Sequence, residues 1–201
     1  MRKRFILFII MLTLLIPTST YAQTTYIVKP GDSMWKIAMK HQVGLSEIIR
    51  ANPHIKNPAL IYPNQKLTIP DISEKNFETQ VVKFVNHERA KRGLKPLEHN
   101  WELSRVARHK SMDMRDRRYF SHTSPTYGSP FTMIQNYGIR YSAAGENIAM
   151  GQSTPQAVVQ SWMNRSGHRA NILSANFTEI GVGYAKGGTG GHYWTQLFIR
   201  K

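Results

Sequence analysis

Two histidines and one glutamate in the second half of the chain are the side chains best suited to act together chemically. Glu146 follows His122 by 24 residues, and His168 follows Glu146 by 22. Only folding can bring residues so far apart into contact. A carboxylate beside an imidazole makes a general base, and two imidazoles can hold Zn²⁺. The sequence therefore predicts a polar cleft that contains His122, Glu146 and His168.

Other residues of chemical interest receive structural roles. Ser121 and Ser124 lie close to His122 in the chain, but no Gly-x-Ser-x-Gly sequence surrounds either, which argues against a serine hydrolase. His192 adjoins the expected last strand in chain order and is interpreted as a structural or rim residue. The tryptophans are interpreted as core residues: Trp35, Trp101, Trp162 and Trp194.

Residues 1–22 have the pattern of a secretory signal peptide. Arg2, Lys3 and Arg4 precede an apolar run over residues 5–16, and Ala22 ends a short segment suited to cleavage. The apolar run is shorter than the roughly 20 residues that span a bilayer. We expect the exported chain to begin near Gln23 and to contain no transmembrane segment once the signal is removed.

The exported chain is basic and contains no cysteine. After removal of residues 1–22, 24 basic side chains stand against 12 acidic ones, which leaves a net charge of +12. A basic surface attracts polyanions, and outside a cell the nearest are anionic wall polymers. The basic residues are scattered, so nucleic-acid binding is not expected. Export without disulfides favours a Gram-positive bacterium as the source.

Residues 25–70 form a first segment with the expected order strand, helix, helix, strand. The strands are predicted at 26–28 and 66–69, and the helices near 34–38 and 45–51. Asp32 and Ser33 have the side-chain oxygens that accept hydrogen bonds from the first amides of a helix. Residues 71–76 are interpreted as a short polar linker.

This first segment resembles a LysM domain. The similarity lies in the run from Tyr26 to Ala38 (YIVKPGDSMWKIA) and the run from Leu60 to Leu67 (LIYPNQKL). The resemblance implies a βααβ module that binds the N-acetylglucosamine glycans of peptidoglycan or chitin in a groove between two loops. The residues that it places at the groove are Gly31, Asp32, Ser33, Met34, Asn57, Ala59, Leu60 and Ile61.

Residues 77–201 form a second segment, rich in helix with a small sheet. Helices are predicted from Phe77 to near Gly93, from Leu103 to near Arg118, from Ser129 to Tyr137, and from Thr154 to Trp162. Strands are predicted at 180–185 and 193–199. The whole chain is therefore predicted to be α+β.

The second segment resembles the bacterial secreted form of the CAP superfamily, also called SCP-like. The similarity lies in Asn86 to Arg89 (NHER), Gly145 to Ala149 (GENIA), Gly167 to Leu173 (GHRANIL) and Glu179 to Tyr184 (EIGVGY). The resemblance implies a three-layer α-β-α sandwich.

The same resemblance assigns the cleft residues. It implies that His122, Glu146 and His168 line a cleft, where His122 and His168 could hold a divalent metal such as zinc or calcium. A second acidic residue is expected near position 165, but this chain has Arg165 there. A cation beside imidazoles lowers their pKa and opposes metal binding. Any metal is therefore expected to bind weakly.

Three classes of function remain open at this stage. The first is a secreted, cell-wall-associated protein that binds peptidoglycan, with envelope or spore-coat assembly as a role. The second is a metal- or histidine-assisted hydrolase of peptide or wall substrates. The third is a lipid- or sterol-binding module, which is known within the superfamily that the segment resembles.

Overall fold

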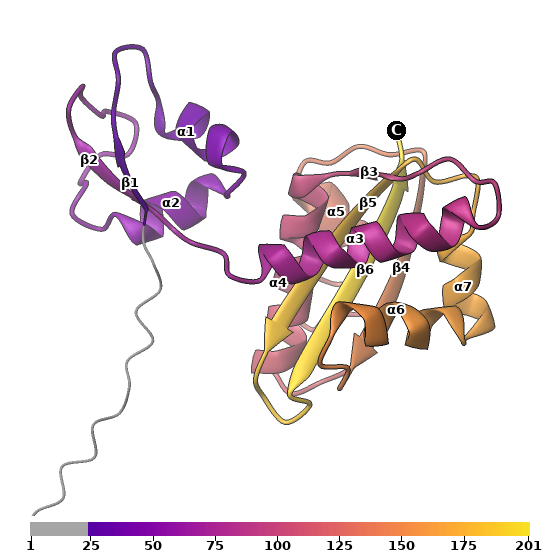
Figure 1. Ribbon diagram of the computed structural model, residues 1–201. Coiled ribbons are helices and arrows are strands. Elements are labelled where there is room, and N and C mark those ends of the chain that lie inside the picture. Colours follow the sequence, from indigo (N-terminus) through magenta and orange to yellow (C-terminus); the bar gives the residue numbers. More distant parts are fainter. Residues whose placement is uncertain (1–23) are drawn as a thin grey trace, which may run out of the picture.

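The computed structural model describes residues 24–201, so the predicted signal peptide lies outside the described residues. Within this range no helix is both long and apolar enough to cross a bilayer. Two units follow each other along the chain, a small one ending near residue 70 and a larger one that starts with a long helix (Figure 1).

The small unit has the predicted order of elements. These are β1 (Thr24–Ile27), α1 (Met34–His41), α2 (Leu45–Ala51) and β2 (Lys66–Ile69). The two strands pair antiparallel. Ser33 begins α1, because its Oγ accepts a hydrogen bond from the amide of Lys36. The buried side chain of Asn52 joins the end of α2 to β2 by bonding both the amide and the carbonyl of Thr68.

Trp35 departs from the prediction that all four tryptophans are core residues. Its side chain is 58% exposed, whereas Trp162 and Trp194 are fully buried. Met34, Ile37 and Ala38 occupy the core face of α1. Trp35 lies about 100° around the helix from Met34, so it points away from the core.

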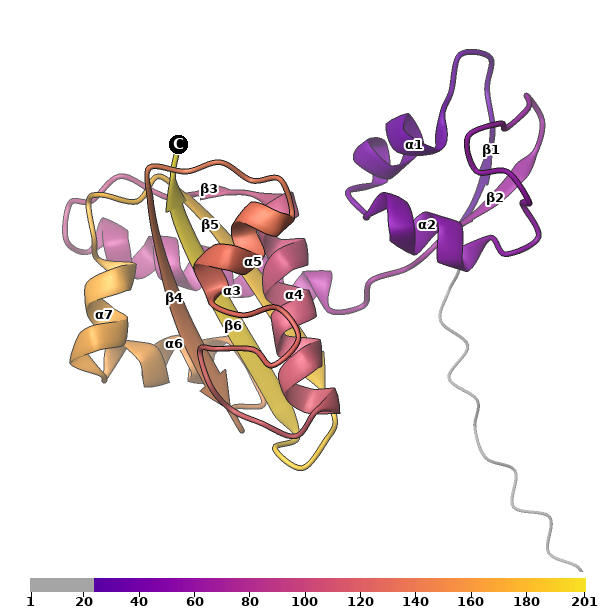
Figure 2. The same ribbon diagram turned by 180° about the vertical axis from the view of Figure 1, so that it is seen from behind.

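The large unit is a four-stranded sheet between two layers of helices (Figures 1 and 2). Its helices are α3 (Lys75–Ala90), α4 (Trp101–Asp116), α5 (Pro130–Asn136), α6 (Pro155–Met163) and α7 (Ser166–Ile172). Its strands are β3 (Glu98–His99), β4 (Ala143–Met150), β5 (Glu179–Lys186) and β6 (His192–Arg200). The strand order is β3-β5-β6-β4, with β3 and β5 parallel and the other pairs antiparallel.

Side chains that alternate between the two faces of the sheet form two separate cores. Trp194 and Phe198 of β6 pack under α3 and α6, while Leu197 and Ile199 pack under α4 and α5. Successive strand residues point to opposite faces, so one strand supplies both cores. The predicted three-layer α-β-α sandwich is confirmed.

Two glycines of β5 let α4 lie close against the sheet. A Cβ at Gly181 would overlap the backbone of Leu103 and Ser104, and a Cβ at Gly183 would overlap the backbone of Ala107. Neither glycine has a positive φ, so close packing explains them better than backbone freedom does. This contact fixes α4, and α4 leads directly into the loop that carries His122.

Some boundaries differ from those predicted. α3 begins at Lys75, so it takes in the last two residues of the predicted 71–76 linker. Three elements that follow α3 were not predicted, namely β3, β4 and α7. β4 contains Ala143, Gly145 and Glu146, residue types that are poor strand formers, so its place in the sheet depends on pairing with β6.

Candidate functional site

His122 and Glu146 meet, as the sequence predicts. Nδ1 of His122 lies 2.6 Å from Oε1 of Glu146. The Glu146 side chain is buried, whereas 55% of the His122 side chain is exposed. The hydrogen bond to Glu146 raises the pKa of His122, although partial burial opposes the shift. Arg165 was expected to lower the pKa of both imidazoles, and for His122 that expectation is wrong because the adjacent carboxylate dominates.

Glu146 comes from the edge strand β4. It pairs with Leu197 of β6 and lies on the sheet face covered by α4. Its Oε2 atom is buried and has no hydrogen-bond partner within the described chain. A buried carboxylate oxygen without a partner requires a further donor, which a water molecule or a ligand can supply.

His122 is held by a buried lysine of α4. Nζ of Lys110 donates to the carbonyl oxygen of His122 at 2.6 Å, and the Lys110 ammonium also lies over the ring of Tyr119. Lys110 is only 1% exposed. Burial lowers its pKa, while the nearby carboxylates of Glu146 and Asp113 act in the opposite direction. Sequence reasoning missed Lys110.

The rest of the His122 loop is held by Asp113, one turn along α4. Its carboxylate accepts hydrogen bonds from three hydroxyl groups, those of Tyr119, Ser124 and Thr126, at 2.6 to 2.7 Å. Burial alone would raise the pKa of Asp113, but these hydrogen bonds lower it. Asp113 therefore stays ionised. It holds the residues that precede and follow His122 in the chain.

His168 lies near this pair but does not bond to it. The side-chain amide of Asn147 donates to the backbone oxygen of His168 at 3.0 Å. The side chain of Asn147 points to the sheet face opposite Glu146. Nδ1 of His168 is buried without a partner in the described chain. Burial and then the charges of Arg165 and His122 lower the pKa of His168.

A second asparagine, Asn171, also joins α7 to β4. Nδ2 of Asn171 donates to the carbonyl oxygen of Glu146 at 3.2 Å and to Oδ1 of Asn147 at 2.8 Å. The GENIA and GHRANIL sequences therefore meet through amide side chains. Their polar residues therefore position β4 and α7 against each other.

A metal site of ordinary strength does not fit the residues present. Over residues 24–201, no three His, Cys, Asp or Glu side chains are grouped so that they could share an ion. Arg165, the N-cap of α7, adds a positive charge close to His168. Catalytic zinc usually needs three protein ligands. We therefore derive no chemical step through a metal, and a two-histidine site remains a prediction.

The predicted glycan residues lie on two loops of the small unit. Gly31 is exposed with a φ of 82°, and Asp32 holds its loop by accepting from Tyr26 Oη and the Lys29 amide, both at 2.8 Å. Met34 is 3% exposed, so its side chain belongs to the core and only its backbone can face a ligand.

The second of these loops follows α2. Asn57 shapes it, because its Oδ1 accepts from the amide of Ala59 and its carbonyl accepts from the amide of Leu60. The side chain of Leu60 is 52% exposed, while Ile61 packs partly against the core. Tyr62, which the prediction omitted, is 59% exposed.

Comparison with known families agrees with this architecture. The family model for CAP, the cysteine-rich secretory protein family, matches residues 82–198, and the LysM domain model matches residues 26–70. The chain belongs to the CAP family, and a LysM domain precedes its CAP domain. LysM domains bind peptidoglycan and chitin-like glycans, so this is the domain composition of a cell-wall-binding protein.

Individual relatives cover different parts of the chain. It is 52% identical over 150 residues to the protein YkwD of Bacillus subtilis, which is 75% of this chain and 57% of that protein. A solved extracellular protein containing an SCP domain from Bacillus anthracis matches with a TM-score of 0.59 and 34% identity, over 69% of this chain and 47% of that one. The chain thus spans about half the length of these relatives.

The LysM segment has its own relatives. It is 40% identical over 48 residues to the spore coat assembly protein ExsA of Bacillus cereus, which is 24% of this chain and 8% of that protein.

Proposed function

We propose that this chain is an exported, wall-associated protein that binds the N-acetylglucosamine glycan of peptidoglycan through its LysM domain. The CAP domain then presents the His122–Glu146 pair beside the wall. The observation that carries the proposal is the pair of exposed LysM loops, one at Gly31 and one at Leu60. The exposed backbone of these loops suits acetamido substituents, and the apolar side chain of Leu60 suits the face of a sugar ring.

Exposed aromatic side chains support the same proposal. Trp35 is the residue after Met34, and Tyr62 is the residue after Ile61, so each adjoins one of the two loops. Both side chains are more than half exposed. Aromatic rings with one apolar face and one polar tip are well suited to contacts that combine stacking and hydrogen bonding.

Cosedimentation of the purified protein with isolated peptidoglycan tests this proposal. Leu60→Asp places a charge on the proposed contact surface and should weaken binding about tenfold, which corresponds to ~1.4 kcal/mol. Met150→Asp changes an equally apolar, exposed side chain on the CAP domain and should leave binding unchanged. Equal binding by the two variants would contradict the glycan assignment.

Deletion of residues 25–70 tests the anchor in cells. We expect the deleted chain to leave the wall and accumulate in the medium. Unchanged retention would mean that the positive charge of the chain holds it on anionic wall polymers instead. High salt would then release it, because salt screens contacts between exposed charges.

The His122–Glu146 geometry favours histidine-assisted hydrolysis as a second candidate. Glu146 engages Nδ1 of His122, and Nε2 makes no hydrogen bond within residues 24–201. An exposed Nε2 on an oriented imidazole can take a proton from water. Cleavage of muropeptides by the wild type should disappear in His122→Ala and persist in His192→Ala. Identical digestion patterns with both variants would exclude this role.

A pocket beside α5 motivates a third candidate, a lipid or sterol site. The pocket has a volume of about 610 Å³, and its lining includes Tyr137, Ile139 and Tyr141. The charged side chains of Glu102, Arg140 and Lys201 also line it, so the pocket suits a small apolar ligand that carries a polar group. Saturable binding of such a ligand that survives His122→Ala and is lost in Ile139→Asp would favour this candidate.

We also propose a more specific location and role for the chain, in assembly of the spore envelope. Its support is the similarity of the LysM segment to a protein named for spore coat assembly. Fractionation of spores and vegetative walls with an antibody to the chain tests it. Signal confined to vegetative walls would remove it.

A further inference from the structure

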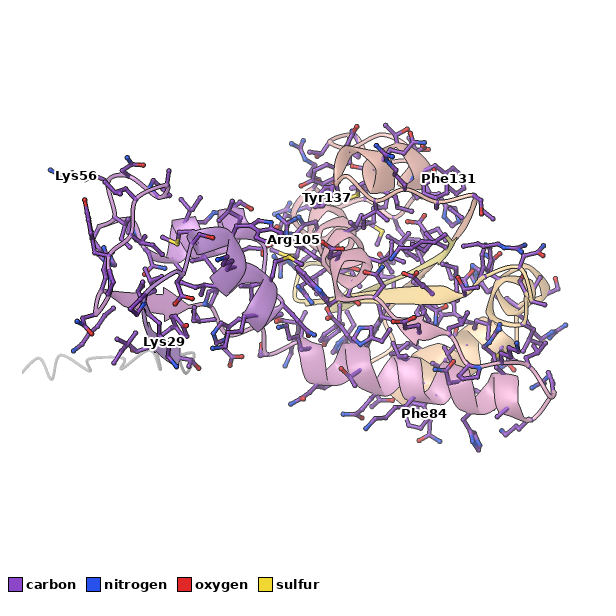
Figure 3. All side chains as sticks on the ribbon, turned by 90° about the horizontal axis from the view of Figure 1, so that it is seen from above. Lys29, Lys56, Phe84, Arg105, Phe131 and Tyr137 are labelled. Atoms are coloured by element: carbon purple, nitrogen blue, oxygen red, sulfur yellow. The ribbon has the colours of Figure 1, made fainter. Side chains whose placement is uncertain are left out.

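Glu47 at the start of α2 in the LysM domain reaches across to α4 of the CAP domain. Its Oε1 atom accepts from Nε of Arg105 at 2.8 Å and lies 3.0 Å from Nε2 of His109. Nη2 of Arg105 also donates to Oγ of Ser46 at 3.0 Å. Figure 3 shows Arg105 at the junction between the two domains. One arginine thus bonds two consecutive LysM side chains.

The receiving side of this contact is itself organised by Tyr137 of the CAP domain. A carboxylate only accepts, so His109 donates from Nε2, and its Nδ1 atom then accepts from the hydroxyl of Tyr137. The guanidinium of Arg105 lies 5.1 Å from the centre of the Tyr137 ring. The side chains of Arg105 and His109 are therefore both oriented by Tyr137, a residue of their own domain.

A second contact lies where the chain enters α3. Nζ of Lys75 donates to the carbonyl oxygen of His41, the last residue of α1, at 3.0 Å. This bond and the Glu47 contacts use different LysM helices and different CAP helices. Two separate points of attachment restrict rotation of one domain on the other more than one point would.

Gly44 adds a packing observation at the same contact, because a side chain at this position would meet Arg105 of the neighbouring domain. Its φ is −72°, a value that any residue adopts. A Cβ at this position would overlap the guanidinium of Arg105 and the carboxylate of Glu47. As the N-cap of α2, a serine would suit the helix better than glycine does. A larger residue here would require the side chains of Arg105 and Glu47 to move, so glycine suits the contact as it stands.

We propose that the LysM domain docks on α4 of the CAP domain through Glu47, so that the two domains form one unit of fixed relative orientation. The contacting side chains of Glu47, Arg105 and His109 are only 16%, 23% and 21% exposed, so bulk water screens the contact less than it screens a surface ion pair. This proposal is independent of glycan binding and of any activity at His122.

Distance measurement between two spin labels tests the docking directly. The chain has no cysteine, so Lys56→Cys and Lys83→Cys introduce one exposed label site in each domain. With otherwise native sequence we expect a single narrow distance distribution. A broad distribution would overturn the proposal, because it would mean that the domains move freely.

Variants at the contact complete the test. Glu47→Gln and Arg105→Gln alter opposite sides of the contact, and each should replace the narrow distribution by a broad one. Gly44→Ser should have the same effect while circular dichroism shows an unchanged helix content. Glu98→Gln removes an exposed carboxylate from β3 and should keep the narrow distribution. A narrow distribution in both Glu47→Gln and Arg105→Gln would overturn the proposal.

Discussion

The ammonium group of Lys110 lies 2.6 Å from the carbonyl oxygen of His122, and Nδ1 of the same residue lies 2.6 Å from Oε1 of Glu146. His122 is therefore held through its backbone by a cation and through its ring by an anion. The two charges have opposite effects on its pKa, since Glu146 raises it and Lys110 lowers it.

This arrangement predicts opposite titration shifts for two substitutions. Glu146→Gln should lower the pKa of His122 because the imidazolium loses its anionic partner, and Lys110→Met should raise it because a nearby cation disappears. Nuclear magnetic resonance of the imidazole protons measures both shifts. The resonances of His87, an exposed histidine on α3, serve as the internal reference in all three proteins. Shifts in the same direction for both variants would contradict the arrangement.

Asp113 should be more important for stability than its neighbour Asp116. Asp113→Asn weakens hydrogen bonds from three hydroxyl groups and should lower the free energy of unfolding by about 2–4 kcal/mol. Asp116→Asn removes a surface carboxylate that pairs with Arg115, and should change the free energy of unfolding by less than about 1 kcal/mol. Urea denaturation at pH 7 measures both values, and equal losses would refute the role given to Asp113.

A methyl group at Gly183 should disturb the contact between β5 and α4. Gly183→Ala places a Cβ in the backbone of α4 and should cost about 3 kcal/mol or more of unfolding free energy. Gly167→Ala in α7 meets no atom within 4 Å and should be neutral or slightly stabilising. Thermal melts of the two variants provide the comparison, and a harmless Gly183→Ala would show that α4 can move away.

Zinc binding should be weak in the native chain and stronger when position 165 is acidic. We expect a Kd of about 1 µM or weaker, because Arg165 adds positive charge beside His168. Arg165→Glu should tighten binding by adding a ligand, whereas Arg140→Glu, a similar charge change on the α5–β4 connection, should not. Calorimetric titration decides the matter, and tight stoichiometric zinc in the native chain would contradict the prediction.

The contribution of Glu47 to stability should depend on acid pH. Burial alone would raise the pKa of Glu47, but hydrogen bonds from His109 and Arg105 outweigh burial and lower it to about 2. Because the folded pKa is below the ordinary value of 4.5, the stabilisation is complete above pH 4.5 and is lost as the pH falls toward 2.

A comparison of the wild type with the single variant Glu47→Gln measures this pH dependence. The difference in unfolding free energy between the wild type and Glu47→Gln should be about 2 kcal/mol at pH 6 and should shrink steadily between pH 4.5 and pH 2.5. A difference that stays constant over this range would mean that Glu47 contributes through shape rather than charge.

The sequence predicts the elements whose pattern is local. α1 and α2 follow from apolar spacing, and the last two strands follow from apolar runs around a glycine-rich turn. β4 could not be predicted in the same way, because its Ala, Gly and Glu residues become a strand only when β6 lies beside them. α7 was missed because just one of its residues, Ile172, is buried.

The sequence predicts which side chains of the site meet, but it does not predict the residues that hold them in place. His122 and Glu146 were expected to converge, and they do. Lys110 and Asp113 were not expected, because their positions on the buried side of α4 depend on the close packing allowed by Gly181 and Gly183. Trp35 could have been recognised as exposed, since Met34, Ile37 and Ala38 already fill the core face of α1.

The side-chain amide of Asn171 has a consequence beyond the His122–Glu146 pair. β4 has a strand neighbour on one side only, so its outer rim could template the addition of a strand from another molecule. Asn171 occupies the carbonyl of Glu146 at that rim, and α7 stands beside it. This edge carbonyl is therefore unavailable to a strand of another molecule, which disfavours pairing of two copies through their sheets.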